Sequence, residues 1–285
     1  MYVVWDLFGG GQNSVYNALK DNPNYDVYTF DITKPTREHH YQVDLSQDNI
    51  VDIFKKYPKP DIIVASPLCQ SFTNVLSMKG GGTCAWTYNE DNSLLVFRSE
   101  EDFEKNKCGF TKSMKYDRQL FLAQLGKKCI DNTLELIDYF NPKTWYIENP
   151  SKSYLWKYLA LNRKEWCHKH NLIPNSCTYG AYGYILTKPT TFASNLWLNL
   201  AYKVLPKPWH FEMINGVKYY VSNFNNYRVK SNPKCRTGSI GLRALVGKSN
   251  SNPFETKQIK EAGVQSQIPP TLIQDIFSQF ANTLK

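Results

Sequence analysis

The chain has 285 residues, of which 42% are hydrophobic and 21% are charged, and its formal net charge is +9 at pH 7. This composition supports a packed core and excludes a wholly disordered chain. Apolar runs stay well short of the roughly 18 residues that span a bilayer, and the first residues lack the basic and apolar regions of a signal peptide. Seven cysteines without a Cys-x-x-Cys pair argue against a disulfide framework or a four-Cys zinc site. We therefore expect a cytoplasmic protein without a membrane segment or a metal.

Strand and helix patterns alternate over the first 70 residues. The predicted strands are 3–5, 25–30, 41–43 and 61–65, and the predicted helices between them are 13–21 and 50–57. Such alternation is typical of a parallel sheet with helices on both faces. We predict an α/β fold with a doubly wound, mostly parallel sheet, in which ligands bind at the carboxyl ends of the strands.

Each predicted strand of this region is followed by a side chain that could do chemistry. Asp6, Asp31 and Asp44 end the first three strands, and Cys69 lies just past the fourth. Because the carboxyl ends of parallel strands meet at one edge of a sheet, we expect these side chains to lie at one ligand site.

The rest of the chain mixes regular and irregular segments. Residues 74–115 have no clear periodicity, and we expect a loop that covers the site. The further predicted elements are a helix at 117–140, a strand at 145–147, a strand-like piece at 217–221 and a final helix at 271–281.

Positive charge is concentrated in one part of the chain. Residues 151–285 contain 18 Lys and Arg against 5 Asp and Glu, and residues 203–260 contain 11 basic residues with only Glu212 and Glu255 as acids. A basic balance confined to one region predicts a surface that binds a polyanion, most simply nucleic acid. A Lys-rich solvated surface is the alternative interpretation.

The glycine run 9–11 follows a strand and precedes a helix. Glycines there let the backbone approach a nucleotide-like ligand, and Asp31, about 20 residues on, can accept ribose hydroxyls. Ser14 occupies the place of the third glycine of the dinucleotide fingerprint, which disfavours NAD. S-adenosylmethionine needs no pyrophosphate cradle and fits the same strand end, while a purely structural turn is the alternative.

Cys69 and Glu148 are the candidate catalytic pair. Cys69 directly follows a buried strand, where a thiolate could act as a nucleophile, although most single cysteines are only small apolar residues. Glu148 ends another predicted strand and brings a carboxyl group to the same edge, where an ordinary strand-end acid is the alternative.

Taken together, these motifs resemble the DNA (cytosine-5) methyltransferase family, in the compact form of phages and small bacterial genomes. Residues 6–11 (Asp-Leu-Phe-Gly-Gly-Gly) are similar to its cofactor motif. Residues 67–73 contain Cys-Gln of its nucleophile motif, and Glu148-Asn149 match its Glu-Asn motif. Residues 177–190 resemble the segment before its target-recognition region, and 265–273 resemble its C-terminal motif.

The resemblance implies a methyltransferase that uses S-adenosyl-L-methionine, acts on double-stranded DNA, and flips the target cytosine out of the duplex. Cys69 would be the nucleophile and Glu148 its acid partner. The implied cofactor-binding residues are Asp6, Phe8, Gly9, Gly11, Asp31, Asp44 and Pro67. The expected DNA-binding residues are Gln70, Ser71 and Lys188, with Arg228, Arg236 and Arg243 in the basic region.

Three positions depart from the family pattern. Leu68 replaces the proline before the cysteine, and Pro150 replaces the apolar residue after Glu-Asn. The Gln-x-Arg-x-Arg motif is not recognisable, and Lys188 is at best a partial substitute for one of its arginines.

The resemblance also sets the expected organisation. We predict a catalytic domain at 1–190, completed by 256–285, and a target-recognition domain at 191–255, in a monomeric protein of a bacterial cell or phage-infected host. A tRNA cytosine-5 methyltransferase and a catalytically inert DNA-binding relative remain alternatives. A nicotinamide-dependent oxidoreductase would need the glycine that Ser14 replaces.

Overall fold

The computed structural model describes residues 1–73, 85–107, 114–184, 187–203, 209–222, 228–230 and 267–283. The chain forms two compact units, one made of Met1–Tyr202 with Ile268–Lys285 and the other of Lys203–Gln267. Within the described ranges, no helix is both long and apolar enough to cross a bilayer.

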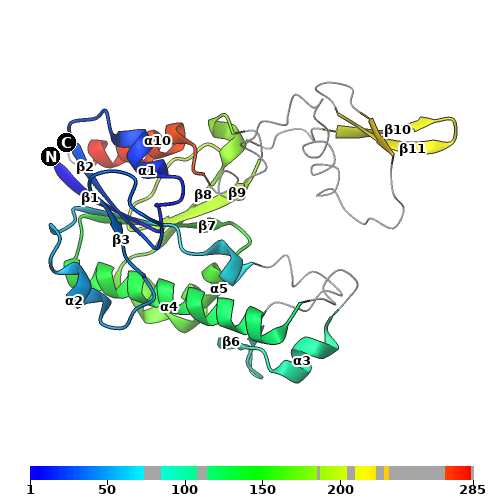
Figure 1. The fold of residues 1–285 in the computed structure, drawn as a ribbon, viewed down its shortest axis with the longest axis horizontal. Helices are drawn as coiled ribbons and strands as arrows, with labels where there is room; N and C mark the ends of the chain where they lie inside the picture. Colours follow the sequence, from blue (N-terminus) through cyan, green and yellow to red (C-terminus); the bar gives the residue numbers. More distant parts are fainter. Residues whose placement is uncertain are drawn as a thin grey trace. The chain divides into compact units, whose positions relative to one another are not determined.

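The first unit is built on a seven-stranded sheet with the order β3-β2-β1-β4-β7-β9-β8 (Figure 1). Its strands are β1 (Tyr2–Leu7), β2 (Tyr25–Asp31), β3 (His40–Gln42), β4 (Ile62–Ala65), β7 (Thr144–Pro150), β8 (Ile173–Thr178) and β9 (Pro189–Ser194). Strands β3, β2, β1, β4 and β7 pair in parallel, whereas β9 is antiparallel to both β7 and β8. The doubly wound, mostly parallel α/β fold predicted from the sequence is therefore confirmed.

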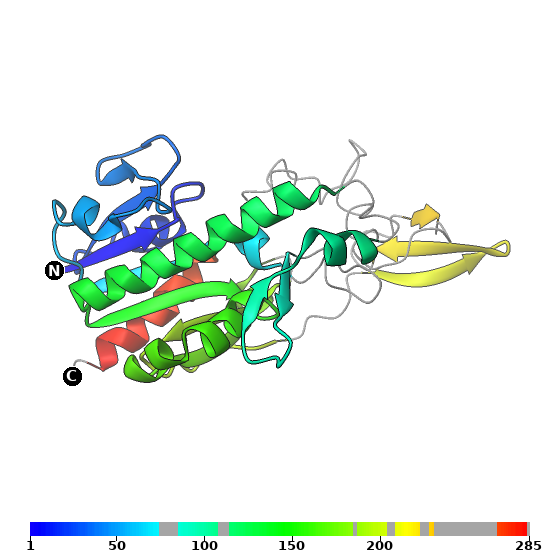
Figure 2. The same cartoon turned by 90° about the horizontal axis from the view of Figure 1, so that it is seen from below.

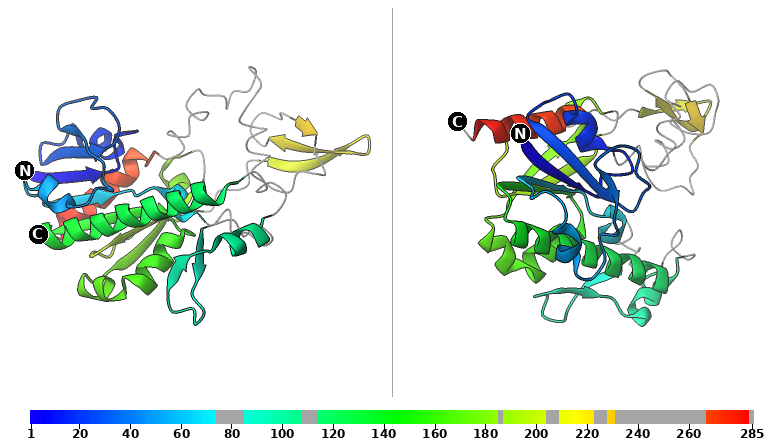
Figure 3. Two further views of the ribbon diagram at one scale, coloured as in Figure 1. Left: turned by 60° about the horizontal axis from the view of Figure 1, so that its bottom comes forward. Right: turned by 60° about the vertical axis from the view of Figure 1, so that its left-hand side comes forward.

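Helices cover both faces of this sheet (Figure 3). One face carries α2 (Ile50–Phe54), α4 (Tyr116–Phe140), α5 (Tyr154–Asn162) and α6 (Lys164–Lys169), and the other carries α1 (Ser14–Leu19) and α10 (Pro270–Asn282). Alternation along β1 supplies both cores, since Trp5 packs with Phe54 and Phe140 on one side and Val4 faces α1 and α10 on the other. The C-terminal helix thus completes the unit that the N-terminal strand begins.

The strand and helix predictions for residues 1–70 are confirmed, with boundaries that differ by a few residues. The helices at 117–140 and 271–281 are confirmed as α4 and α10, and the strand at 145–147 as the middle of β7. Strands β8 and β9 and helices α5 and α6 were not predicted.

The expectation of an irregular segment over 74–115 is wrong for most of its described part, since residues 85–107 contain regular elements. There the chain forms a hairpin of β5 (Trp86–Tyr88) and β6 (Leu95–Phe97), followed by α3 (Glu100–Lys105). Asn89 makes the turn, because its backbone N–H donates to Leu94 O at 3.0 Å and its side chain accepts from Leu94 N at 2.8 Å. Ser99 caps α3 by accepting from Asp102 N at 3.2 Å. Residues 74–84 and 108–113 lie outside the described residues.

The second unit contains an antiparallel sheet of β10 (Trp209–Ile214), β11 (Val217–Ser222) and β12 (Arg228–Lys230), which Figure 2 shows in yellow to orange. Asn215 and Gly216 both have positive φ, as a tight two-residue hairpin requires. The strand-like piece predicted at 217–221 is confirmed as β11. Arg236 and Arg243 lie outside the described residues, and Arg228 begins β12.

Candidate active site

The turn after β1 is tightly packed and requires glycine at two positions. Phe8 has φ of 69°, and its N–H donates to Phe30 O at 2.9 Å, which fixes the start of the turn. A Cβ at Gly9 would collide with the Asp6 carboxylate, and one at Gly10 would collide with the side chains of Thr33 and Asp31. Gly11 has open space around it. The turn therefore presents bare backbone next to the end of β2, and the nucleotide-like ligand expected there stays a prediction.

Asp6 lies buried beneath this turn, with its Oδ2 atom unpartnered among the described residues. Burial raises the pKa of Asp6 to about 7, although the Arg37 guanidinium opposes this shift. Thr29 links the two groups, because its hydroxyl accepts from Arg37 Nη2 at 2.5 Å and hydrogen-bonds the Asp6 carboxyl. Arg37 was not singled out from the sequence, since no motif surrounds it and its partners lie in other elements.

Asp31 ends β2, and Asp44 lies two residues beyond β3, each in a local turn. Asp31 is half-buried and accepts from Thr33 N at 2.9 Å, and the exposed Asp44 accepts from Ser46 N at 2.9 Å. Asn132 of α4 holds the loop after Asp44, because its side-chain amide donates to Leu45 O and Gln47 O, both at 2.8 Å. Asn132 is a supporting residue that the sequence did not reveal.

Cys69 begins a short 3-10 helix, η1 (Cys69–Phe72), just after β4. The residue is exposed, as is Gln70, whereas Pro67 before it is buried. Asn149, at the end of β7, donates its side-chain amide to Pro67 O at 2.9 Å and so fixes the segment that leads into Cys69. Cys69 thus lies at the edge of the sheet, as expected from the sequence. Asn149, the second residue of the Glu148-Asn149 motif, supports the segment that precedes it.

The buried side of η1 contacts three other elements. The Trp86 indole N–H donates to Ser71 O at 2.8 Å, and its ring stacks on Phe72 with centroids 5.5 Å apart. Ser153 Oγ, which also caps α5, donates to Phe72 O at 3.3 Å. Gly126 of α4 lies directly against Ser71. Ser71 is itself buried, so the DNA contact expected for it stays a prediction.

Glu148 lies buried at the carboxyl end of β7, which the register Ala65↔Ile147 places beside the end of β4. The Tyr179 hydroxyl donates to Glu148 Oε1 at 2.9 Å. Burial raises the pKa of Glu148, while the Lys188 ammonium and the hydrogen bonds from Tyr179 and Ser66 oppose the shift. A buried carboxyl group of raised pKa is suited to hold a proton and donate it.

Cys69, Glu148 and Lys188 are close enough to influence one another electrostatically. The pKa of Cys69 is raised because the surrounding protein disfavours the thiolate, although the residue reaches solvent, and because Glu148 adds negative charge. Lys188 and nearby backbone N–H groups oppose the shift. Lys188 itself has φ of 34°, and its Nζ lies 4.3 Å from the centroid of the Tyr179 ring. A thiol, a buried carboxyl group and an ammonium group thus meet at this edge of the sheet.

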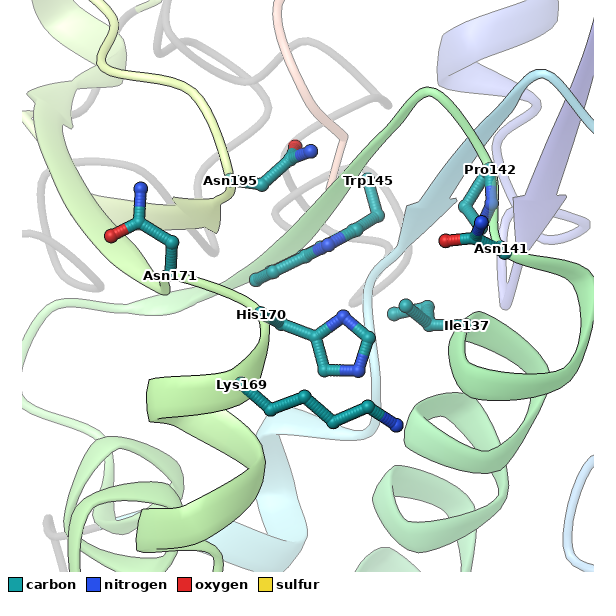
Figure 4. A pocket seen from close by; sticks show the side chains of 8 residues that line it. All are labelled: Ile137, Asn141, Pro142, Trp145, Lys169, His170, Asn171 and Asn195. Atoms are coloured by element: carbon teal, nitrogen blue, oxygen red, sulfur yellow. The ribbon is translucent and has the colours of Figure 1, made fainter.

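A pocket of about 300 Å³ lies elsewhere on the same unit, at the amino end of β7 (Figure 4). It is lined by Ile137, Asn141, Pro142, Trp145, Lys169, His170, Asn171 and Asn195. Lys169 forms an ion pair with Asp138, and His170 hydrogen-bonds the same carboxylate. None of the predicted site residues lines this pocket.

The residues that the structure describes include no group of three or more His, Cys, Asp or Glu side chains arranged to hold a metal ion. Cysteine and histidine residues also occur together at 167–170, where Cys167 donates to Leu159 O at 3.4 Å and His170 hydrogen-bonds Asp138 at 2.7 Å. Both contacts serve packing between neighbouring helices.

No protein-family model matches the chain, and no curated protein matches it. Among solved structures, the methyltransferase EhMeth of Entamoeba histolytica has a TM-score of 0.50 and 12% identity, over 100% of this chain and 99% of that protein. The chain has a methyltransferase-like fold. A protein encoded within an Escherichia coli prophage, provisionally assigned as a DNA modification methyltransferase, has a TM-score of 0.38 and 14% identity over 68% of this chain. The chain spans 46% of that protein.

Proposed function

We propose that the chain transfers a methyl group from S-adenosyl-L-methionine to carbon-5 of a cytosine in double-stranded DNA. The observation that carries the proposal is the placement of Cys69 and Glu148 at the ends of adjacent parallel strands, where burial and the nearby Glu148 carboxylate raise the pKa of the Cys69 thiol. The methyltransferase-like fold supports methyl transfer as the reaction class.

A thiol and a buried carboxyl group suit the chemistry of cytosine. Carbon-5 is a poor nucleophile until a group adds to carbon-6, and a thiolate adds readily and leaves again. Addition of Cys69 Sγ to carbon-6 would place negative charge on the ring, which a proton held by Glu148 at ring nitrogen 3 offsets. After carbon-5 is methylated, loss of its proton and departure of Cys69 restore the aromatic ring and the thiolate.

The glycine turn fits an adenosyl ligand, because bare backbone at Gly9 and Gly10 lies beside the half-buried Asp31. We propose that Phe8, Gly9, Gly11, Asp31 and Asp44 contact the cofactor, that Pro67 adjoins it, and that Asp6 holds the turn from below. S-adenosylmethionine supplies the methyl group as an electrophilic sulfonium. The turn's requirement for glycine comes from packing against Asp6 and Asp31, so the same side chains shape the turn and adjoin its ligand.

The basic region supports a nucleic acid partner. Residues 203–260 contain 11 Lys and Arg, and all of them lie in the second unit, Lys203–Gln267. We propose that this unit binds DNA, with Gln70 and Lys188 at the edge of the active site near the target base. Carbon-5 and carbon-6 of a paired cytosine cannot be reached inside the stack, so the base must flip out at a cost of a few kcal/mol.

The test is methylation by the purified chain, read at single-base resolution. Duplex DNA and tRNA are incubated separately with S-adenosylmethionine and then sequenced for 5-methylcytosine. We expect methylation of cytosine in DNA within a fixed sequence context, its loss in Cys69→Ala, and its retention in the matched control Cys167→Ala. Methylation of adenine, or of tRNA alone, would overturn the proposal.

A further inference from the structure

Tyr179 is a fully buried aromatic residue that contacts both charged groups of the candidate site. It begins the 3-10 helix η4 (Tyr179–Tyr182), directly after β8, and has no exposed surface. Its hydroxyl donates to Glu148 Oε1 at 2.9 Å, and the Lys188 ammonium lies 4.3 Å from its ring centroid. One side chain therefore links the carboxyl group and the ammonium group.

The backbone holds Tyr179 and Lys188 opposite each other. Tyr179 N donates to Lys188 O at 3.3 Å, next to the β8–β9 register pair Thr178↔Pro189. The Tyr179 and Tyr184 rings form a T-shaped pair at 89°, with centroids 5.8 Å apart. A side chain held from several directions in this way has little freedom to rotate, so it can fix the group to which it donates.

We propose that Tyr179 is a positioning residue for Glu148: its hydroxyl fixes one carboxyl oxygen and its ring holds Lys188 nearby, so that the carboxyl group keeps one orientation toward the substrate base. This inference rests on the proposed function. Phenol-to-carboxylate hydrogen bonds are charge-assisted and strong in buried surroundings, whereas a carboxyl group without such a partner would rotate. Among the described residues, Ser66 also hydrogen-bonds Glu148, and Tyr179 adds a second hydroxyl donor, at 2.9 Å from Oε1.

The titratable groups that face Glu148 are Cys69 from η1, Cys177 from β8, Tyr179 from η4, and Lys188 from the segment before β9. Tyr179 and Lys188 favour the ionised carboxylate, and burial opposes it more strongly. Removing the Tyr179 hydroxyl takes away a bond to the ionised form, so the pKa of Glu148 must rise further. A residue that merely filled space would leave this pKa unchanged.

The test compares Tyr179→Phe with a matched control, Tyr182→Phe. Tyr182 lies in the same 3-10 helix, but its hydroxyl donates to Asp275 at 2.7 Å and accepts from Ala201 N at 2.9 Å. The titration of Glu148 is followed by NMR in protein labelled with carbon-13 at the glutamate carboxyl groups, with Glu148→Gln identifying its signal. We expect Tyr179→Phe to move this titration to higher pH and Tyr182→Phe to leave it in place.

Methyl transfer is the second measurement. We expect Tyr179→Phe to lower kcat by about ten- to a hundred-fold, the scale for a lost hydrogen bond to a charged group, with an unchanged KM for S-adenosylmethionine and a pH optimum shifted upward. Parent-like titration and parent-like kcat in Tyr179→Phe would overturn the inference. If the parent protein methylates neither DNA nor tRNA, the proposed function fails, while the NMR comparison still decides whether Tyr179 governs Glu148.

A second variant, Lys188→Gln, tests the inference independently in case Tyr179→Phe does not fold. Lys188→Gln removes the ammonium that lies over the same ring, and it must also raise the pKa of Glu148, because that positive charge favours the carboxylate. An unchanged titration in Lys188→Gln would contradict the electrostatic link between the three groups.

Discussion

Replacing Gly126 with alanine tests how closely α4 packs against the short helix that carries Cys69. Gly126 is buried in the middle of α4, and an added Cβ would overlap Ser71 Cβ and Oγ. The next atom it would meet is Phe72 Cε2, at 3.1 Å. The substitution therefore pushes on η1 through Ser71 and Phe72, without directly contacting Cys69 or Glu148.

Two opposing effects set the change in the free energy of unfolding that Gly126→Ala causes. In an unhindered helix, Gly→Ala stabilises a protein by about 1 kcal/mol, because alanine loses less backbone entropy on folding. Forcing extra volume into a close-packed contact costs about 1–3 kcal/mol. We expect Gly126→Ala to lower the free energy of unfolding by up to about 2 kcal/mol, so that the usual gain is cancelled or reversed.

The assay is urea-induced unfolding of four proteins: the parent, Gly126→Ala, Ser71→Gly and the double variant. Ser71→Gly removes the atoms that the new Cβ would overlap. We therefore expect the double variant to be more stable, by about 1–3 kcal/mol in the free energy of unfolding, than the summed effects of the two single substitutions predict. A stabilisation by Gly126→Ala alone, with no coupling to Ser71, would refute the packing of α4 on η1.

Three further predictions concern charge. Burial raises the pKa of Asp6 to about 7, so the folded state keeps a proton there that the unfolded chain loses above about pH 4, and stability should fall as pH rises through this window. Asp6→Asn should flatten that dependence, by at most about 4 kcal/mol, in unfolding measured across pH; a parent-like slope would contradict the assignment. Glu148→Gln should speed alkylation of Cys69 by iodoacetamide at alkaline pH, because the Glu148 carboxylate raises the pKa of this thiol; an equal or slower rate would show that the two groups do not interact. In the basic region, Lys230→Ala should weaken binding to all duplexes and reduce the salt slope by about one unit, whereas Arg228→Ala should cost about 1–3 kcal/mol at the cognate sequence only. Parent-like binding of both variants to cognate and scrambled duplexes, titrated at several salt concentrations, would argue against this strand as the DNA-reading surface.

The parallel half of the fold could be predicted because its signals are local. A buried parallel strand is a short apolar run, and β4 is such a run, directly followed by the segment that leads to Cys69. Since strand ends meet at one edge of a parallel sheet, Cys69 and Glu148 could be brought together from the sequence alone. The rule does not say which strands are neighbours. The structure shows that β4 and β7 pair directly, with Ala65 opposite Ile147.

The hairpin at 86–97 escaped prediction because its strands are only three residues long and its turn contains no Asn-Gly or Asp-Gly pair. Its stability comes from distant residues, since Asn162 of α5 exchanges hydrogen bonds with the backbone of Leu95, at 3.0 and 2.9 Å. Trp86 is likewise buried against Phe72. Tertiary contacts of this kind leave no periodic pattern in the sequence.

The residues that support the site could not be predicted either, because their contacts are also with residues distant in the sequence. Asn132 lies 87 positions from Leu45, which it holds, and Tyr179 lies 31 positions from Glu148. Asn132 is an ordinary polar residue of a helix with no motif around it, and Tyr179 lies in the family-like segment 177–190 without any feature that marks its contact with Glu148. Their roles follow only from the three-dimensional arrangement.

Covalent trapping tests the central claim most directly. A duplex that carries 5-fluorocytosine in the methylated sequence context is incubated with the protein and S-adenosylmethionine, and the products are mapped by peptide mass spectrometry. Fluorine replaces the proton whose loss would release the enzyme, so we predict a stable adduct between the methylated base and Cys69, absent in Cys69→Ala. Methylation of ordinary duplex without any adduct on the fluorinated one, or an adduct on another cysteine, would contradict the account.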